Sequence, residues 1–232
     1  MLKLIYQENN VTTANLYLRE GRARRLSPLT PSVVSIIGLF EPERRRVEDF
    51  IKAIYKQSYN ADIEVNYPIL MSVRNAEGDI LAAVGFRYAK DEPLFLEHYT
   101  GAPVETFLNT PRDEIVEIGN LASAGQGASA FLFAALASYL SNKNIRYAAI
   151  TGTDFLHRYF ERAGLKPRKL CDADINAVAE DAQSWGSYYD TQPRVLIGDV
   201  ETGVKRLKAM LGAEFEDCRP RLFLRLHYKD GV

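Results

Sequence analysis

The sequence predicts an α/β or α+β fold, in which a mixed β-sheet carries helices on its faces. Two patterns predict it. Residues 67–74 and 79–88 have the composition of two strands joined by turn-forming residues, which indicates an antiparallel hairpin. Residues 114–122, 128–140 and 145–151 then have the patterns of a strand, a helix and a strand. Consecutive parallel strands need such a crossover, so both kinds of strand pairing are expected in one sheet.

The composition is that of an ordinary globular protein with one core. The chain has 232 residues, of which 47% are hydrophobic and 25% charged, and its formal net charge is -1. This balance lacks the basic excess that nucleic-acid binding needs, so we expect no nucleic-acid partner.

Clear patterns begin only near Pro42. We therefore expect residues 1–40 to be an N-terminal extension packed on a core domain of residues 41–232.

The apolar segments are too short for a membrane-spanning helix or a signal peptide. The longest, residues 33–40 and 128–140, fall short of the ~20 residues that a spanning helix needs. Cys171 and Cys218 are too few for a disulfide framework, which favours a reducing compartment. We expect a cytoplasmic protein without a transmembrane segment, and a peripheral contact with a membrane stays open.

Local patterns predict further elements on both sides of the hairpin. Residues 11–20 indicate a strand, and a helix is expected from Pro42, after which apolar residues recur at helical spacing. Residues 94–99 are a short apolar segment that suits a strand. Residues 102–108 suit one or two turns of helix.

Helix start and stop signals mark the second half of the chain. Thr153 suits the N-cap of a short helix that stops at Gly164. Towards the C-terminus, the patterns predict a strand at residues 194–200, a helix at 201–211 and an edge strand at 221–228.

A small, glycine-bearing loop joins the strand at residues 114–122 to the apolar helix that follows. Glycines let the backbone approach a ligand closely, and the free N–H groups at the start of a helix attract an anion. A pyrophosphate or a phosphopantetheine phosphate would suit this loop, which consists of Ser123, Ala124, Gly125, Gln126, Gly127, Ala128 and Ser129. The alternative is a tight turn whose small residues serve packing alone. The loop lacks the lysine of a P-loop and the third glycine of a dinucleotide site.

The order of these elements resembles the GNAT superfamily of acyltransferases. There a pyrophosphate-binding loop joins a strand to a helix, and a later element has an aromatic residue, polar positions and a glycine. Here that element is Tyr159-Phe160-Glu161-Arg162-Ala163-Gly164-Leu165. The superfamily commonly has Gln or Arg three residues before the first loop glycine, where this chain has Ala122. The resemblance implies a GNAT-like, mostly antiparallel twisted sheet flanked by helices.

Several segments are similar to a narrower group, the thermostable hemolysin family, which is related in fold to GNAT enzymes and to acyl-homoserine-lactone synthases. They are Leu94-Phe95-Leu96-Glu97-His98-Tyr99, Pro103-Val104-Glu105, Val116-Glu117-Ile118-Gly119-Asn120-Leu121-Ala122, and Trp185-Gly186-Ser187-Tyr188-Tyr189 with Pro193. Lactone synthases carry Glu-x-Ser-Arg-Phe where this chain has Gly119 and Asn120 in place of Ser and Arg. This departure argues against lactone synthesis from S-adenosylmethionine and leaves acyl transfer in general.

The resemblance implies transfer of an acyl group from acyl-CoA or acyl-carrier protein to a small-molecule amine or hydroxyl, with N-acylation as the expected type and no metal. An acidic carrier protein would dock at Arg44-Arg45-Arg46, or at Arg22, Arg24 and Arg25. The apolar helix from Ala128 would wall a tunnel for a long acyl chain. Two other functions stay open: a module that binds acyl-CoA without turnover, and a membrane-active protein.

Acyl transfer to an amine needs a group that removes a proton from the ammonium, and Glu117 is the first candidate. If Ile115 and Leu121 face one side of the strand, Glu117 shares that side by the two-residue period, and an apolar setting would raise its pKa. The alternative is a surface glutamate. Glu97 is the second candidate, by its similarity to the family. On a strand its neighbour His98 would point to the opposite face, and we expect His98 to be exposed.

Two further side chains are candidates for the remaining steps. Tyr159 would give its phenolic proton to the leaving thiolate, as GNAT enzymes often arrange, and core packing is the alternative. Asn120 would donate to the thioester carbonyl, and a strand-end hydrogen bond is the alternative. His157 is expected on the surface or in a capping role, and the two cysteines lack the spacing of metal ligands.

Overall fold

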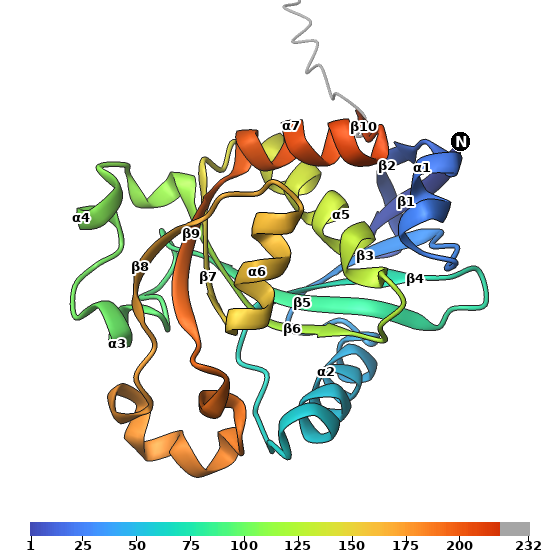
Figure 1. Ribbon diagram of the computed structural model, residues 1–232. Helices are drawn as coiled ribbons and strands as arrows, with labels where there is room; N and C mark the ends of the chain where they lie inside the picture. Colours follow the sequence, from blue (N-terminus) through green and yellow to red (C-terminus); the bar gives the residue numbers. More distant parts are fainter. Residues whose placement is uncertain (219–232) are drawn as a thin grey trace, which may run out of the picture.

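The computed structural model describes residues 1–218, apart from the side chains of residues 179–182. These residues form a ten-stranded sheet with the order β10-β2-β1-β3-β4-β5-β6-β7-β9-β8 (Figure 1). The strands are β1 (Leu2–Glu8), β2 (Val11–Leu18), β3 (Val33–Ile37), β4 (Ile69–Arg74), β5 (Ile80–Tyr88), β6 (Ile115–Ser123), β7 (Tyr147–Gly152), β8 (Arg168–Asp172), β9 (Arg194–Asp199) and β10 (Glu214–Asp217). Neighbours are antiparallel except in the pairs β1–β3 and β6–β7. The predicted mixed, mostly antiparallel sheet is confirmed.

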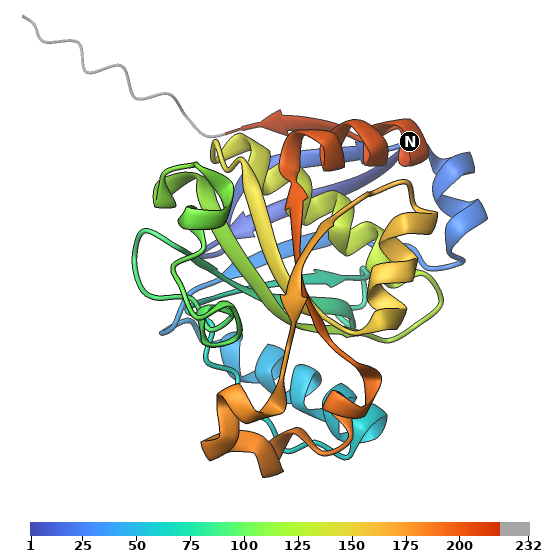
Figure 2. The ribbon, with the colours of Figure 1, turned by 60° about the vertical axis from the view of Figure 1, so that its left-hand side comes forward.

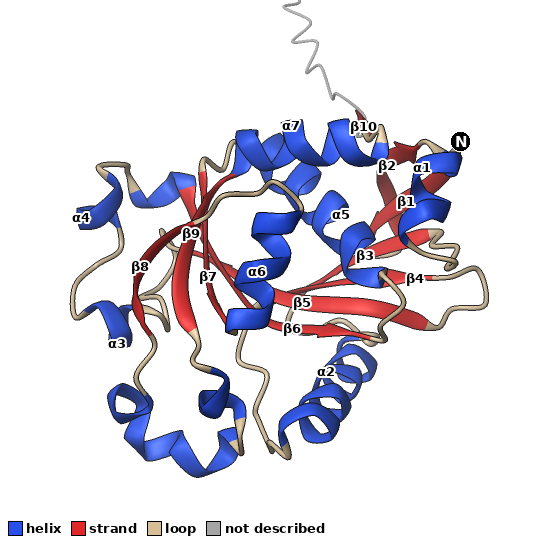
Figure 3. Cartoon of the chain, in the orientation of Figure 1, coloured by secondary structure: helices blue, strands red, loops and turns tan. Residues whose placement is uncertain are grey.

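Helices cover both faces of this sheet (Figure 3). They are α1 (Glu20–Leu26), α2 (Arg44–Tyr59), α3 (Glu97–Thr100), α4 (Glu105–Leu108), α5 (Ala128–Asn142), α6 (Asp154–Arg162) and α7 (Val200–Leu211), with 3-10 turns at Arg112–Glu114, Ile175–Trp185 and Tyr188–Thr191. α5 packs on α7, β4 and β5, and α2 packs on β4, β5 and β6. The two helices belong to separate apolar clusters on opposite faces. Figure 2 shows the last two 3-10 turns (orange) beside α2.

The predicted hairpin and crossover are both present. β4 and β5 pair in antiparallel register, and their turn is closed by the N–H of Asp79, which donates to Asn75 Oδ1 at 2.7 Å. β6 and β7 run parallel and are joined by α5. α5 is buried nearly all round because the sheet and α7 enclose it, which explains its apolar sequence.

The prediction of a strand at residues 94–99 is wrong. This segment is a loop that leads into the single turn of α3, and the N–H of Tyr99 donates to the carbonyl of Leu96. The Glu97 carboxylate stabilises the turn, because it accepts the N–H groups of Leu94 and Val104, each at 2.9 Å. Leu94 and Leu96 are buried, as apolar residues of a strand would be. Their segment, however, is held by the Glu97 carboxylate and does not pair with a neighbouring strand.

Most of the other local predictions are confirmed within a few residues. Thr153 caps α6, since its hydroxyl oxygen accepts the N–H of Leu156 at 3.2 Å. The helical turn α4 falls within residues 102–108, and β9 and α7 fall at the predicted strand and helix. The edge strand predicted at residues 221–228 lies outside the described residues.

The first forty residues contribute β1, β2, α1 and β3 to the structure. Of these, only the strand at residues 11–20 was predicted, and β2 confirms it. β3 pairs with β4, and β2 pairs with β10 from the other end of the described chain. The division of the chain at residue 40 stays a prediction, although its two parts share one sheet.

The basic cluster at the start of α2 does not form a free surface throughout. Arg44 is 7% exposed and donates to the carbonyls of Tyr67 at 2.7 Å and Pro68 at 3.2 Å. It also pairs with Glu48 at 2.7 Å. Arg44 therefore anchors the segment before β4 and is not available to a partner, whereas Arg45 and Arg46 are exposed and docking there stays a prediction. Over residues 1–218, no helix combines the length and apolar character needed to cross a membrane.

Candidate active site

The parallel strands β6 and β7 separate in the middle of the sheet. Their ladder ends at the pair Ile118–Ile150, although β6 continues to Ser123 and β7 to Gly152. Just beyond this point β6 contains a bulge, because three residue steps from Gly119 to Ala122 face two steps on β5. Asn120 lies in the bulge with a left-handed φ of 50°. The edge of β6 that faces β7 is thus released from strand pairing at the centre of the molecule.

The bulge changes which side chains share a face of β6. Ile115 packs with Leu94 and Leu96, on the side where Glu117 also lies. Leu121 instead packs against the cluster that contains α5. The expectation that Ile115 and Leu121 face one side is therefore wrong, because the extra residue reverses the alternation between them. The expectation that Glu117 is buried beside Ile115 is correct.

A central cavity of about 250 Å³ occupies the place where the two strands separate. It reaches from α2 on one face to α5 and α6 on the other. Its lining consists of Ile54, Tyr55, Tyr59, Gly119, Leu121, Ser123, Ser129, Phe133, Ile150, Thr151, Gly152, Thr153, Phe155, Leu156, Tyr159 and Tyr188. Two residues of the predicted phosphate loop, Ser123 and Ser129, are therefore at this cavity, together with Tyr159.

The glycine loop has free N–H groups beside this cavity. Gly125, Gln126 and Gly127 all have left-handed φ values, of 87°, 51° and 81°. Within residues 1–218, the N–H groups of Gln126, Gly127 and Ser129 donate to no protein acceptor. Gly127 packs on the carbonyl of Leu26, whereas the space beside Gly125 is open. The loop thus has the donors and the access that an anion would need.

The carboxylate of Glu117 is held on the other face of the sheet. It is 1% exposed and accepts the N–H groups of Phe95 at 2.9 Å and Leu96 at 2.8 Å. Arg87 lies beside it, with Nε 3.3 Å from Oε2. Burial raises the pKa of Glu117 to about 7, against the opposing effects of Arg87 and the two N–H groups. The carboxyl therefore exchanges a proton near neutral pH.

Glu97 has a different environment from Glu117. Besides the two N–H groups described above, it pairs with Arg112 at 2.7 Å, which also binds Glu105 at 2.6 Å. Burial alone would raise the pKa of Glu97, but Arg112 and the N–H groups hold it below its ordinary value. Neither Glu97 nor Glu117 lines any of the cavities described here, and His98 is exposed as expected. Glu97 stabilises the loop whose N–H groups hold Glu117.

An aromatic pocket of about 70 Å³ adjoins the central cavity on the α2 side. Six aromatic side chains line it: Tyr55, Tyr67, Phe95, Tyr99, Trp185 and Tyr188. Asn120 also lines it and hydrogen-bonds the Tyr55 hydroxyl. The sequence did not assign these rings to a site. The signals were two segments that carried the family resemblance without a role for their rings, Leu94 to Tyr99 and Trp185 to Tyr189.

Glycine at position 119 is required by the packing of this pocket. The ring of Tyr67 lies directly over Gly85 and Gly119, and a Cβ atom at either glycine would collide with it. Arg87 stacks on the same ring, 4.6 Å from its centroid. The replacement of Ser by Gly119, noted in the sequence, thus makes room for Tyr67.

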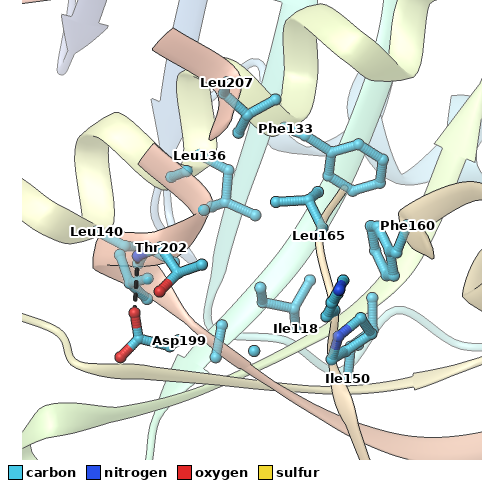
Figure 4. Close-up of a pocket in the computed structure, with 17 residues that line it drawn as sticks. Ile118, Phe133, Leu136, Leu140, Ile150, Phe160, Leu165, Asp199, Thr202 and Leu207 are labelled. Carbon is cyan, nitrogen blue, oxygen red and sulfur yellow. Dashed lines mark hydrogen bonds between the residues drawn. The ribbon is translucent and has the colours of Figure 1, made fainter. Parts of the chain in front are cut away.

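An apolar pocket of about 230 Å³ opens on the opposite face, between α5, α7 and β7 (Figure 4). Its lining includes Ile118, Phe133, Leu136, Leu140, Ile150, Phe160, Leu165 and Leu207. Phe133 and Ile150 also line the central cavity, so the two spaces adjoin. α5 supplies one wall, at the place where the sequence predicted a tunnel.

Tyr159 and Asn120 have partners that fix their side chains. The Tyr159 hydroxyl hydrogen-bonds Ser129 at the start of α5, and burial raises the pKa of Tyr159. It therefore keeps its proton at neutral pH.

Cys171 and Cys218 are free cysteines. Over the described residues, no group of His, Cys, Asp and Glu side chains has the arrangement of a metal site.

Comparisons with known proteins agree with this architecture. No curated protein sequence matches significantly. Three solved structures are similar. BjaI, a CoA-dependent acyl-homoserine lactone synthase with S-adenosylmethionine and isopentyl-CoA, has a TM-score of 0.56 at 10% identity, over 77% of this chain and 89% of its own. MesI, another CoA-dependent synthase, has 0.52 at 14%, over 77% and 95%. Apo TofI has 0.53 at 13%, over 76% and 98%. At these identities the likeness concerns the fold alone, and it confirms the expected relationship in fold to acyl-homoserine lactone synthases.

The sequence itself carries the narrower relationship. A model of the thermostable hemolysin family matches residues 39–204, which is more than half of the chain. The match includes α2, the strands that separate and the aromatic segment near Trp185. The chain therefore belongs to the thermostable hemolysin family.

Proposed function

We propose that this protein is an acyltransferase that moves an acyl group from an acyl thioester to an amine. One observation carries the proposal. The central cavity adjoins an apolar pocket on one face and an aromatic pocket on the other, and it lies beside a loop with free N–H groups. A thioester donor has the parts that fit these surroundings: a phosphate, a reactive carbonyl and an acyl chain.

The phosphate of the donor would bind at the glycine loop. The N–H groups of Gln126, Gly127 and Ser129 are available there, and α5 is a helix of 15 residues. Its N-terminal end carries a partial positive charge that favours an anion. Either CoA or the phosphopantetheine of a carrier protein meets this requirement. The predicted docking site for a carrier protein stays a proposal at α1, where Leu26 contacts Gly127 and the side chain of Arg25 is exposed.

The acyl chain would occupy the apolar pocket. The path to it passes Phe133 and Ile150, which line both the pocket and the central cavity. Each buried methylene contributes about 0.8 kcal/mol to binding. We therefore expect donors with medium or long chains to be preferred over acetyl donors.

The reaction would take place where β6 and β7 separate. The amine nitrogen attacks the thioester carbon, a C–N bond forms and the C–S bond breaks. Unpaired backbone N–H groups at this edge of β6 would stabilise the oxyanion. Tyr159 would give its proton to the leaving thiolate and would be reprotonated by the second proton that the nitrogen loses as the amide forms. Glu117 would receive, through water, the proton that the ammonium loses.

Asn120 and Glu97 have positioning roles in this scheme. Asn120 holds the Tyr55 hydroxyl, and the Tyr55 ring borders both the central cavity and the aromatic pocket. Glu97 holds the loop that supplies Phe95 and Leu96 to Glu117.

The test is to supply the purified protein with acyl-CoA donors of increasing chain length and a mixture of primary amines. We expect thiol release that depends on the amine, and an N-acyl product detected by mass spectrometry. Donor binding without turnover in every mixture would contradict the proposal and favour a binding module. Leakage of liposomes without any donor would instead favour a membrane-active protein.

A further inference from the structure

The aromatic pocket has a composition that selects what binds in it. Six aromatic rings line a space of about 70 Å³, which is much smaller than the roughly 300–1,000 Å³ of a pocket that encloses a whole ligand. It can therefore take only the end group of a molecule. The faces of aromatic rings carry partial negative charge, and they attract a cation within about 6 Å.

The charges around the pocket point in the same direction. Arg87 is the only cation among the described lining residues. Glu117 lies 3.3 Å from its Nε and Glu92 3.5 Å from its Nη1, and its Nη2 donates to the carbonyl of Asn66 at 3.1 Å. Among the described residues its buried Nε has no hydrogen-bond partner. Glu64 lines the pocket with a side chain that is 75% exposed, and it pairs with Lys52. A carboxylate entering the pocket would thus compete with Glu117 and Glu92 for Arg87.

A hydrogen-bond acceptor is available where the pocket meets the central cavity. Thr151 lines both spaces, together with Tyr55, Gly119 and Tyr188. The Thr151 hydroxyl oxygen is buried and has no hydrogen-bond partner among the described residues. A buried hydroxyl without a partner is destabilising unless something binds it. A ligand with N–H groups would satisfy it.

We propose that the acceptor is a primary amine that binds as an ammonium ion and carries no carboxylate next to its nitrogen. This inference rests on the proposed acyl transfer. The rings hold the charged group, and Thr151 accepts one of its N–H groups. The nitrogen then lies at the border with the central cavity. Alcohols lack the charge, and α-amino acids bring a carboxylate into a pocket where Glu117 and Glu92 already lie beside Arg87.

The chain contains one tryptophan, Trp185, and it lines this pocket, so its fluorescence reports binding there without any acyl donor. Three probes share one carbon chain: butylamine, 1-butanol and norvaline, which is butylamine with a carboxylate on the carbon that bears nitrogen. We expect butylamine to bind about tenfold more tightly than the other two. Equal binding of all three, or tighter binding of norvaline, would overturn the proposal.

Two variants at one position test the role of the hydroxyl. Thr151→Val keeps the shape and removes the acceptor, and we expect it to weaken butylamine binding about tenfold. Thr151→Ser restores the hydroxyl and should restore the binding. Unchanged binding in Thr151→Val would refute the assigned contact. The titrations contain no donor, so they test the pocket alone. If butylamine binds but the activity assay shows no consumption of acyl-CoA, the proposed function is rejected and the pocket assignment stands.

Discussion

Glu117 combines well-formed hydrogen bonds with a raised pKa. Its carboxylate accepts two backbone N–H groups and faces Arg87, yet burial dominates and raises its pKa to about 7. The ordinary value is 4.5. Between these two pH values the folded protein holds a proton that the unfolded chain has released.

This difference predicts the pH dependence of stability. The free energy of unfolding should fall by about 3 kcal/mol as the pH rises from about 4.5 to about 7, because the folded state binds the extra proton in that range. Glu117→Gln should remove this slope, although it also leaves one backbone N–H poorly paired and lowers the stability as a whole. Urea unfolding of both proteins at several pH values measures the slope.

Glu97 supplies a control with the opposite sign. Its pKa is below the ordinary value, so its contribution is present above pH 4.5 and is lost as the pH falls through its folded-state pKa. Glu97→Gln should reduce the loss of stability in acid and leave the slope towards neutral pH in place. If Glu117→Gln and the unmodified protein lost stability in parallel from pH 4.5 to 7, the buried proton would belong to another group.

At the scale of single residues, the sequence predicted burial and a raised pKa for Glu117 from its apolar neighbours. It could not predict Arg87 or Tyr67 as partners. Both belong to segments other than β6, and nothing in the sequence around either residue indicates that it lies near Glu117. The sequence also suggested a chemical role for Glu97, because its segment resembles the family. That resemblance could not show that Arg112 pairs with the Glu97 carboxylate.

At the scale of elements, the glycine loop allows a matched comparison. Gly125 and Gly127 both have left-handed φ values, but only at Gly127 would a Cβ atom collide, with the carbonyl of Leu26. Gly125→Ala should therefore cost about 1 kcal/mol for the backbone conformation alone, and Gly127→Ala on the order of 3 kcal/mol. Thermal unfolding of the two variants measures the difference. Equal losses would mean that α1 moves away freely.

Helix α7 offers a test of the apolar pocket. Gly203 lines the pocket. A Cβ atom added at Gly203 would lie 3.9 Å from Leu165 Cδ2, which is its nearest neighbour. Gly203→Leu should fill part of the space and shift the preference to shorter acyl donors. Gly203→Ala is the control. Like the leucine variant, it raises the helix propensity by about 1 kcal/mol relative to glycine, but it does not fill the pocket. Values of kcat/KM for a series of chain lengths provide the measurement. An unchanged profile in Gly203→Leu would place the acyl chain elsewhere.

Elements with a strong period were predictable, and irregular ones were not. The helical spacing in α2, the apolar run of α5 and the turn residues between β4 and β5 are clear signals. The bulge in β6 has only a weak one, namely an asparagine that tolerates a left-handed conformation. A regular two-residue period therefore placed Leu121 on the wrong face. The loop at residues 94–99 was misread because burial, and not pairing, determines its composition.

At the scale of the whole molecule, the first forty residues provide the clearest test of domain organisation. They contribute Leu4, Tyr6, Leu16, Leu18, Val34 and Ile36 to the main apolar cluster. The Tyr6 hydroxyl also donates to the carbonyl of Ala135 in α5 at 2.8 Å. We expect a chain of residues 41–232 to fail to fold, because it loses this burial and exposes the edge of β4. Circular dichroism and thermal unfolding test this. A cooperative transition in the shortened chain would support a separate extension.

The site itself could be predicted only in part at this scale. The glycine loop and Tyr159 belong to the element order that the resemblance covers. The aromatic pocket combines Tyr55, Phe95 and Trp185 from segments far apart in sequence. Only the strand order brings these segments together. No local pattern indicates that order, because it depends on which distant strands pair.

The pairing of β10 with β2 has a consequence for how the protein is made. Glu214 to Asp217 supply the partner for Ala14 to Tyr17, so a ribosome has produced nearly two hundred residues before that early strand is covered. Until then β2 has one row of backbone groups open to any extended peptide that comes near. Slow or interrupted translation should thus expose nascent chains to aggregation, and a chaperone that shields extended segments would protect them at this stage.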